Sequence, residues 1–408
     1  MKKIALILWI WGSLLAAKAQ NTLPEYLTTA GENHPELRAA FANYQSALET
    51  VLPAGALPDP ELTFGYFISP LETRLGPRNF NVTISQMFPW MGTLSAQKQQ
   101  AGANAEAAYF AYLSQKQALF YEVKTHFFTL YEQNKRIQYL EDFIENLDFY
   151  EKVSEQNLGS GRSNTAMLLE VRLQQRKARR TLENLQQTFK QGERNFLRLI
   201  GDTTITEVAL PDTMVIAKVD ADSLQPDWSQ QPLWQQKQQQ MLAAEQAEQL
   251  AKLSGRPNIG VGLDYGLIGQ RTDMEVAENG RDVWMPMLSL SLPINRRKYR
   301  ALAQKEAYQK EVFALEQEAV ELEVANAVEA RRVELNNLAG EIADLKQNAA
   351  DLQEIIRLSE QELSSSKIGT ELLLRRERDY IDNLMEMEVK MATYHIYLAN
   401  IQQLLGTL

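Results

Sequence analysis

The sequence contains no cysteine among its 408 residues. Disulfide bonds therefore cannot stabilise the fold, and a lipid anchor attached to cysteine is excluded. Histidine is scarce as well, since His34, His126 and His395 are widely separated along stretches typical of helix. No Gly-x-Ser-x-Gly elbow, His-Glu-x-x-His motif or phosphate-binding loop occurs. We therefore predict that the chain is not an enzyme and has no catalytic residue, no metal site and no cofactor.

Long apolar runs are missing except at the N-terminus. There the run Ile4 to Leu15 follows two lysines and precedes Ala17-Lys18-Ala19, the small-x-small pattern that signal peptidase cleaves. The run is shorter than the ~20 residues that a membrane-spanning helix needs, which disfavours an uncleaved anchor. We predict that residues 1–19 are a signal peptide. An exported chain without a spanning helix stays in a membrane only as a closed β-barrel, and is otherwise soluble.

Basic residues are fewer than acidic residues, so the formal net charge is −10. A chain of this charge repels the phosphate backbone, so nucleic acid is excluded as a partner. Charged and glutamine-rich segments with helical periodicity dominate, while glycine and proline cluster in short windows. The fold class predicted from this composition is mainly α with a small β part.

An internal repeat organises the chain after the signal peptide. Pro35 and Pro232 each open a helix and lie 197 residues apart, as do Pro60 and Pro257, which each precede a strand. In both copies a second strand and a long helix follow. We predict a first repeat at 20–200, a linker at 201–227 and a second repeat at 228–408.

Four segments alternate between apolar and polar residues with the period of a β-strand: 61–68, 81–88, 258–267 and 283–292. Their length and alternation suit membrane barrel strands, although soluble hairpins packed on helices are an alternative. Asp264 among glycines favours a wet face opposite the apolar one. Four strands cannot close a membrane barrel, because the smallest have about eight, so several subunits must combine their strands. The residues predicted to face lipid are Phe64, Tyr66, Val261, Leu263, Trp284 and Leu290.

The helical segments match one another in length. Thr93 to Leu158 is a proline-free stretch of 66 residues, equivalent to roughly 100 Å of helix. Two shorter helices stacked end to end, Ser163 to Ile200 and Pro24 to Leu52, have nearly the same combined length. Apolar residues spaced by three and four along these segments predict coiled-coil pairing.

Two strand-pair and long-helix repeats, a linker between them and glycine-marked helix breaks resemble the TolC family of outer-membrane factors, also called outer membrane efflux proteins. The resemblance implies a homotrimer in which four strands per subunit form a transmembrane β-barrel and duplicated coiled-coil hairpins form an α-barrel in the periplasm. It also implies contact with outer-membrane lipid, a periplasmic adaptor (membrane fusion protein) and an inner-membrane pump of the resistance-nodulation-division type. The segments His34-Pro35-Glu36-Leu37 and Ser85-Gln86-Met87-Phe88-Pro89-Trp90-Met91-Gly92 resemble the branch serving Cus/Czc heavy-metal pumps.

In this family the helix breaks are the periplasmic tips, where inward helices close the channel. The resemblance places the tip glycines at Gly159, Gly161 and Gly369, with Arg162, Ser163 and Asn164 forming a tip turn and cap or an adaptor contact. Arg375 stands where family members often carry aspartate, and the nearest acid is Glu371. A ring of Glu371 favours cations, whereas the simpler interpretation is a helix-start carboxylate. The remaining predicted gate residues are Leu372, Leu373 and Leu168.

The predicted function is therefore the exit duct of a tripartite efflux pump that carries small molecules or metal ions across the outer membrane. The duct of a type I protein secretion system is an alternative with the same architecture. A non-porous periplasmic scaffold would not need strands with one apolar face, and an adaptor would carry one hairpin instead of two.

Overall fold

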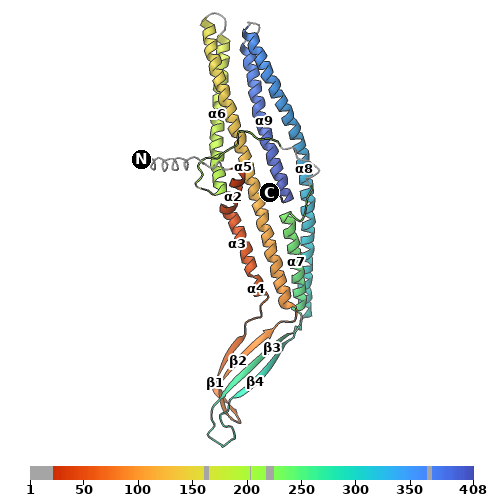
Figure 1. The fold of residues 1–408 in the computed structure, drawn as a ribbon. Helices are drawn as coiled ribbons and strands as arrows, with labels where there is room; N and C mark the ends of the chain where they lie inside the picture. The colour runs from red at the N-terminus through yellow and green to blue at the C-terminus, as the bar shows by residue number, and fades with distance from the viewer. Residues whose placement is uncertain (1–21, 160–164, 203, 217–224, 365–369) are drawn as a thin grey trace, which may run out of the picture. The chain divides into compact units, whose positions relative to one another are not determined.

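The computed structural model describes residues 22–159, 165–202, 204–216, 225–364 and 370–408, so the predicted signal peptide at 1–19 lies outside the described residues. The described part is mainly helical with one small sheet, which confirms the predicted fold class (Figure 1). Within this part, no helix is both long enough and apolar enough to cross a membrane. The helices are α2 (Leu23–Asn33), α3 (Pro35–Glu49), α4 (Val51–Ala54), α5 (Thr93–Gly159), α6 (Thr165–Ile200), α7 (Pro232–Leu253), α8 (Arg296–Ser364) and α9 (Thr370–Leu405).

Local sequence signals account for several helix ends. The Glu25 carboxylate accepts a hydrogen bond of 2.8 Å from the Thr22 backbone N–H, which pairs a free group at the start of α2. Pro35 separates α2 from α3, because a proline cannot donate the backbone hydrogen bond that a continuous helix requires. Gly201 ends α6 with a φ of 70°, a left-handed conformation that favours glycine.

The chain divides into two compact units that do not coincide with the two predicted repeats. Of the residues that the structure describes, one unit contains those within 22–39, 113–231 and 322–408, and the other contains 40–112 and 232–321. Each unit therefore takes segments from both halves of the sequence. The first is called the helical unit below, and the second, which contains the sheet, is called the strand unit.

The strand unit holds a four-stranded antiparallel sheet in the order β1-β2-β3-β4. The strands are β1 (Glu61–Thr73), β2 (Gly76–Phe88), β3 (Asn258–Ile268) and β4 (Val283–Ser291). Because β2 pairs with β3, the two halves of the sequence join in the middle of the sheet. β1 and β4 are the edge strands, each with one side unpaired in the described chain.

The first hairpin is longer than the pattern of apolar residues predicts. β1 continues to Thr73 and β2 begins at Gly76, where a φ of 135° permits the tight turn. Pro70 lies in β1 within an irregular part of the pairing between Tyr66 and Leu71. A proline is tolerated there because the strand is at an edge and the ladder is interrupted.

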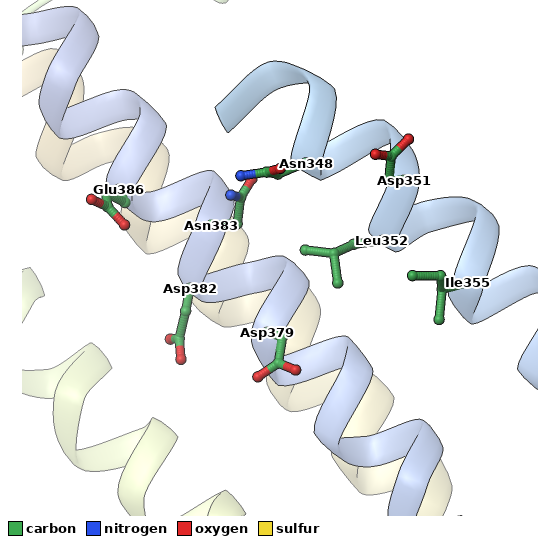
Figure 2. Close-up of a pocket in the computed structure, with 8 residues that line it drawn as sticks. All are labelled: Asn348, Asp351, Leu352, Ile355, Asp379, Asp382, Asn383 and Glu386. Carbon is green, nitrogen blue, oxygen red and sulfur yellow. The ribbon is translucent and has the colours of Figure 1, made fainter. Parts of the chain in front are cut away.

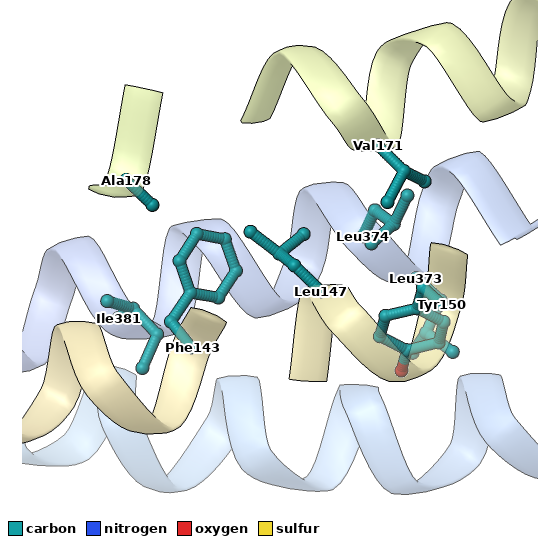
Figure 3. Packing of buried hydrophobic residues seen from close by; sticks show 8 residues of the cluster. All are labelled: Phe143, Leu147, Tyr150, Val171, Ala178, Leu373, Leu374 and Ile381. Atoms are coloured by element: carbon teal, nitrogen blue, oxygen red, sulfur yellow. The ribbon is translucent and has the colours of Figure 1, made fainter. Parts of the chain in front are cut away.

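The helical unit has a core built from three helices that are distant in the sequence (Figure 3). Leu147 and Val171 are fully buried in it, and Ile356 of α8 packs against it. The apolar stripe of α6 contributes Val171 and Ala178 to this core. Other residues of the stripe are buried along the helix (Leu168, Gln175, Leu185 and Phe196), and the rest are half-buried (Leu182, Phe189 and Gly192). The cluster consists of Phe143, Leu147 and Tyr150 from α5, Val171 and Ala178 from α6, and Leu373, Leu374 and Ile381 from α9.

Candidate functional site

One face of the sheet is apolar across all four strands. Phe64 is paired with Val82, Val82 with Tyr265, and Tyr265 with Trp284, and residues directly opposite in an antiparallel sheet share a face. The same register places Ile84, Leu263 and Pro286 side by side. All six residues predicted to contact lipid lie on this face and are exposed or half-buried: Phe64, Tyr66, Val261, Leu263, Trp284 and Leu290.

The opposite face carries a polar network centred on Asp264, which is 4% exposed. Its carboxylate forms an ion pair with Arg78. It also accepts hydrogen bonds of 3.0 Å from the Asn81 side chain and 2.7 Å from the Thr83 hydroxyl. Asp264 is therefore held by residues of β2 and joins β2 to β3.

The loop between β3 and β4 is fastened to the β1–β2 turn. The Gly280 N–H donates to the Leu75 carbonyl at 2.8 Å, and the Gly269 N–H donates to the Pro77 carbonyl at 2.7 Å. Arg271 forms two contacts of 2.7 Å with the Asp273 carboxylate. The two hairpin ends thus form one tethered group at the same end of the sheet.

The predicted gate residues divide into two groups in the helical unit. Leu373 is buried in the core that joins α5, α6 and α9 and is only 1% exposed (Figure 3). Leu168 of α6 is buried as well. Glu371, Leu372 and Arg375 are exposed on the first turns of α9. Among the described side chains, Glu371 and Arg375 form no ion pair with each other.

The remaining predicted tip residues are mostly beyond the part of the chain that the structure describes. Gly159 is the last residue of α5. Gly161, Arg162, Ser163, Asn164 and Gly369 lie outside the described residues.

Two buried glutamates on α9 escape detection in the sequence. Glu388 is 3% exposed and accepts a hydrogen bond of 2.8 Å from the Tyr139 hydroxyl. Glu377 is also buried and accepts one of 2.7 Å from the Tyr150 hydroxyl. In each carboxylate the second oxygen is buried without a hydrogen-bond partner. These pairs join α9 to α5 at two levels of the helical unit.

The Glu388 carboxylate is also connected to the segment that links the two halves of the chain. The Tyr131 hydroxyl lies near Glu388 and accepts a hydrogen bond of 3.2 Å from the Met214 backbone N–H. Burial, together with the nearby Glu388 charge, raises the pKa of Tyr131 to about 12, so its hydroxyl keeps its proton. Burial raises the pKa of Glu388 above its ordinary 4.5, and the bond from Tyr139 opposes this with a smaller effect.

Replacing Glu388 by Gln is expected to reduce the loss of stability as the pH rises. A carboxyl whose pKa is raised in the folded state binds its proton more tightly there than in the unfolded state. This tighter proton binding stabilises the folded state fully below pH 4.5, and the stabilisation is lost as the pH rises through the folded pKa of Glu388. The unfolding temperatures of the unmodified protein and of Glu388→Gln should therefore agree near pH 4. At pH 8 the unfolding temperature of Glu388→Gln should be the higher of the two. Equal pH dependence in both proteins would contradict this account.

Among the described residues, no group of three or more His, Asp or Glu side chains is arranged to hold a metal ion. No curated protein matches the sequence. The model of the outer membrane efflux protein family matches residues 27–202, a segment that begins in α2 and ends just after α6. Over this segment, which is less than half of the chain, the sequence is similar to the outer membrane efflux protein family.

Solved structures of outer-membrane channels share the fold of this chain at low sequence identity. CusC matches with a TM-score of 0.72 and 17% identity over 95% of this chain and 92% of its own. The Campylobacter jejuni channel CmeC matches with a TM-score of 0.76 and 10% identity over 94% of this chain and 85% of its own. VceC from Vibrio cholerae matches with a TM-score of 0.74 and 12% identity over 94% of this chain and 96% of its own. Likenesses at this level of identity establish the fold of the chain alone.

Proposed function

We propose that three copies of the chain form the exit duct of a tripartite efflux pump, with a twelve-stranded barrel in the outer membrane. The observation that carries this proposal is the predominantly apolar face that extends over all four strands, between two unpaired edges, with Gln86 of β2 as a polar residue on it. A single four-stranded sheet leaves the backbone groups of β1 and β4 without partners. Pairing β4 of each copy with β1 of the next satisfies these groups in a closed ring.

The two faces of the sheet suit the two environments of such a barrel. Side chains such as Phe64, Leu263 and Leu290 would contact lipid, and the aromatic rings of Tyr66 and Trp284 suit a membrane interface. The opposite face, with glycines, serines and the Arg78–Asp264 pair, suits a water-filled lumen. Similarity to CusC, CmeC and VceC supports the same arrangement.

The helical unit would extend into the periplasm and meet an adaptor and an inner-membrane pump of the resistance-nodulation-division type. Small molecules or metal ions are the proposed cargo. At the helix ends, three copies of Glu371 would form a ring that attracts cations, while Leu168 and Leu373 would hold the helices together by packing. In this proposal the exposed Glu371 carboxylates determine which ions approach the gate, and the buried leucines hold its helices together.

Assembly can be tested by native mass spectrometry of the mature chain in detergent, with strand content followed by circular dichroism. We expect a trimer with the four strands intact. Heating should convert the trimer to monomers and remove the strand signal in the same transition, because the strands depend on closure. A monomer that keeps its full strand content would contradict the proposed barrel.

A further inference from the structure

Helix α6 exposes a second stripe of residues beside the one buried in the core. Leu169 and Leu173 are 57% and 38% exposed, although leucines of a helical bundle usually pack inside. Arg176 and Arg180 continue the same stripe at spacings of three and four. Within the described residues, Arg176 has no ion-pair partner. This stripe, called the α6 seam, is therefore apolar near the start of the helix and basic further along.

Helix α8 carries a matching stripe with the opposite charge. Leu358 and Ile355 are 46% and 40% exposed and lie near the end of the helix. Asp351, Asn348 and Asp344 continue the stripe at spacings of three and four and are all exposed. Within the described residues neither aspartate pairs with a cation, and Asp351 only accepts a bond of 2.9 Å from Gln347. These five residues are called the α8 seam.

The surroundings of the α8 seam reinforce its negative charge. A groove between α8 and α9 is lined by Asp351 and Ile355 on one side and by Asp379, Asp382 and Glu386 on the other (Figure 2). Asp379 and Asp382 lie 3.6 Å from arginines of their own helix, which offsets part of their charge. The remaining acidic charge favours a basic surface as the partner of this side of the helical unit.

The two seams lie at the same depth in the helical unit. Val171 of α6 belongs to the core cluster against which Ile356 of α8 packs, so both residues lie within the depth that this cluster spans. Leu173 and Ile355 lie within two residues of them on their helices. Arg176 is 11 residues from the start of α6 at Thr165, and Asp351 is 13 residues from the end of α8 at Ser364. At ~1.5 Å per residue, the charged positions differ in depth by only about 3 Å.

We propose that the α6 seam of one copy packs against the α8 seam of the next copy in the trimer. The inference rests on the proposed function, since it needs a ring of copies whose axis runs along the helices. Rotation about such an axis keeps every residue at its own height, so only surfaces of equal depth can meet. Figure 1 shows α6 and α8 at opposite sides of the helical unit, as this contact requires. Leu173 then meets Ile355, and Arg176 meets Asp351.

Engineered cysteines test the contact directly, because the chain has none of its own. In the assembled protein, Leu173→Cys combined with Ile355→Cys should give a covalent trimer on mild oxidation, seen on a non-reducing denaturing gel. Each single variant should remain monomeric on the same gel. The matched control is Leu173→Cys with Asp344→Cys, which lies three turns further along α8, roughly 16 Å away, beyond the reach of a disulfide.

The outcomes separate this contact from the proposed trimer. If native mass spectrometry finds the trimer but the Leu173/Ile355 pair does not cross-link, the seams do not face each other and serve another surface, such as an adaptor helix. If no trimer forms in the unmodified chain, both proposals fail. Cross-linking of the control pair as well would show non-specific association and would also overturn the contact.

A charge exchange provides a second test that does not need cysteine. Arg176→Asp places two negative side chains together and should lower the temperature at which the trimer dissociates. Adding Asp351→Arg should restore most of the loss, which a purely structural effect of either residue would not do. Lys177→Asp is the control, since this exposed cation lies one residue on and outside the seam. Additive effects of Arg176→Asp and Asp351→Arg would contradict the pairing.

Discussion

Replacing Leu290 by Arg is expected to reduce the amount of folded channel in the outer membrane several-fold. Leu290 is exposed on the apolar face, and its neighbour on β3 is Ile259. A charged side chain on the lipid face of a barrel costs about 2–4 kcal/mol near the membrane midplane, falling to about 0–1 kcal/mol near the interfaces. Leu263→Arg on β3 should have a similar effect. The yield is measured as the amount of heat-modifiable trimer in washed outer membranes.

Ser289→Arg is the matched control for Leu290→Arg. The two residues are adjacent in β4, so their side chains lie on opposite faces, and both are exposed at the edge of the sheet. The serine would face the aqueous lumen, where arginine is solvated, and yield should change little. A greater loss from Ser289→Arg than from Leu290→Arg would mean that the faces are reversed and that the apolar side does not contact lipid.

The sheet was largely predictable because alternation is a local signal. Phe64 and Tyr66 alternate with small or polar residues, and so do Val261 and Leu263, which fixes which residues share a face. The extension of the first hairpin was not predictable in this way. Pro70 interrupts the apolar pattern, and the turn at Gly76 depends on pairing with the opposite strand.

Polar residues that are buried by tertiary contacts explain the main failures. The sequence predicts that Asp264 lies on the face opposite the apolar one, but it gives no sign that Arg78, 186 residues away, supplies the counter-charge. Glu377 and Glu388 are buried on α9 although glutamate is typical of exposed positions, so their burial has no signal in the sequence. The tyrosines that bind these glutamates lie on α5, more than 200 residues earlier.

At the start of α9, the sequence names candidate gate residues but does not show which of their side chains are buried and which are exposed. Leu372, Leu373 and Leu374 are consecutive, and any of them could occupy the core position of the helix. The structure buries Leu373 and Leu374, whereas Leu372 is 40% exposed. The direction of a helix face depends on the partners that α5 and α6 provide, and neither is near α9 in the sequence.

Leu373→Ala is expected to destabilise the helical unit by about 2–5 kcal/mol, the range for removing a fully buried leucine. The side chain lies among residues of α5, α6 and α9, including Tyr150 and Val171 (Figure 3). Truncation leaves a cavity where these helices meet. Thermal unfolding followed by helical circular dichroism measures the loss. Leu372→Ala is the control, because its exposed side chain leaves no comparable cavity.

The same pair of variants links this core to the gate. If packing between the helix ends holds the channel closed, Leu373→Ala should raise the resting conductance of trimers in planar bilayers, while Leu372→Ala should not. Glu371→Gln should lower the preference for cations without changing stability, since the carboxylate is exposed on the first turn of α9. If Leu373→Ala unfolds at a lower temperature but conducts like the unmodified channel, the core supports the helices without closing the pore. The constriction would then lie at another level of the channel.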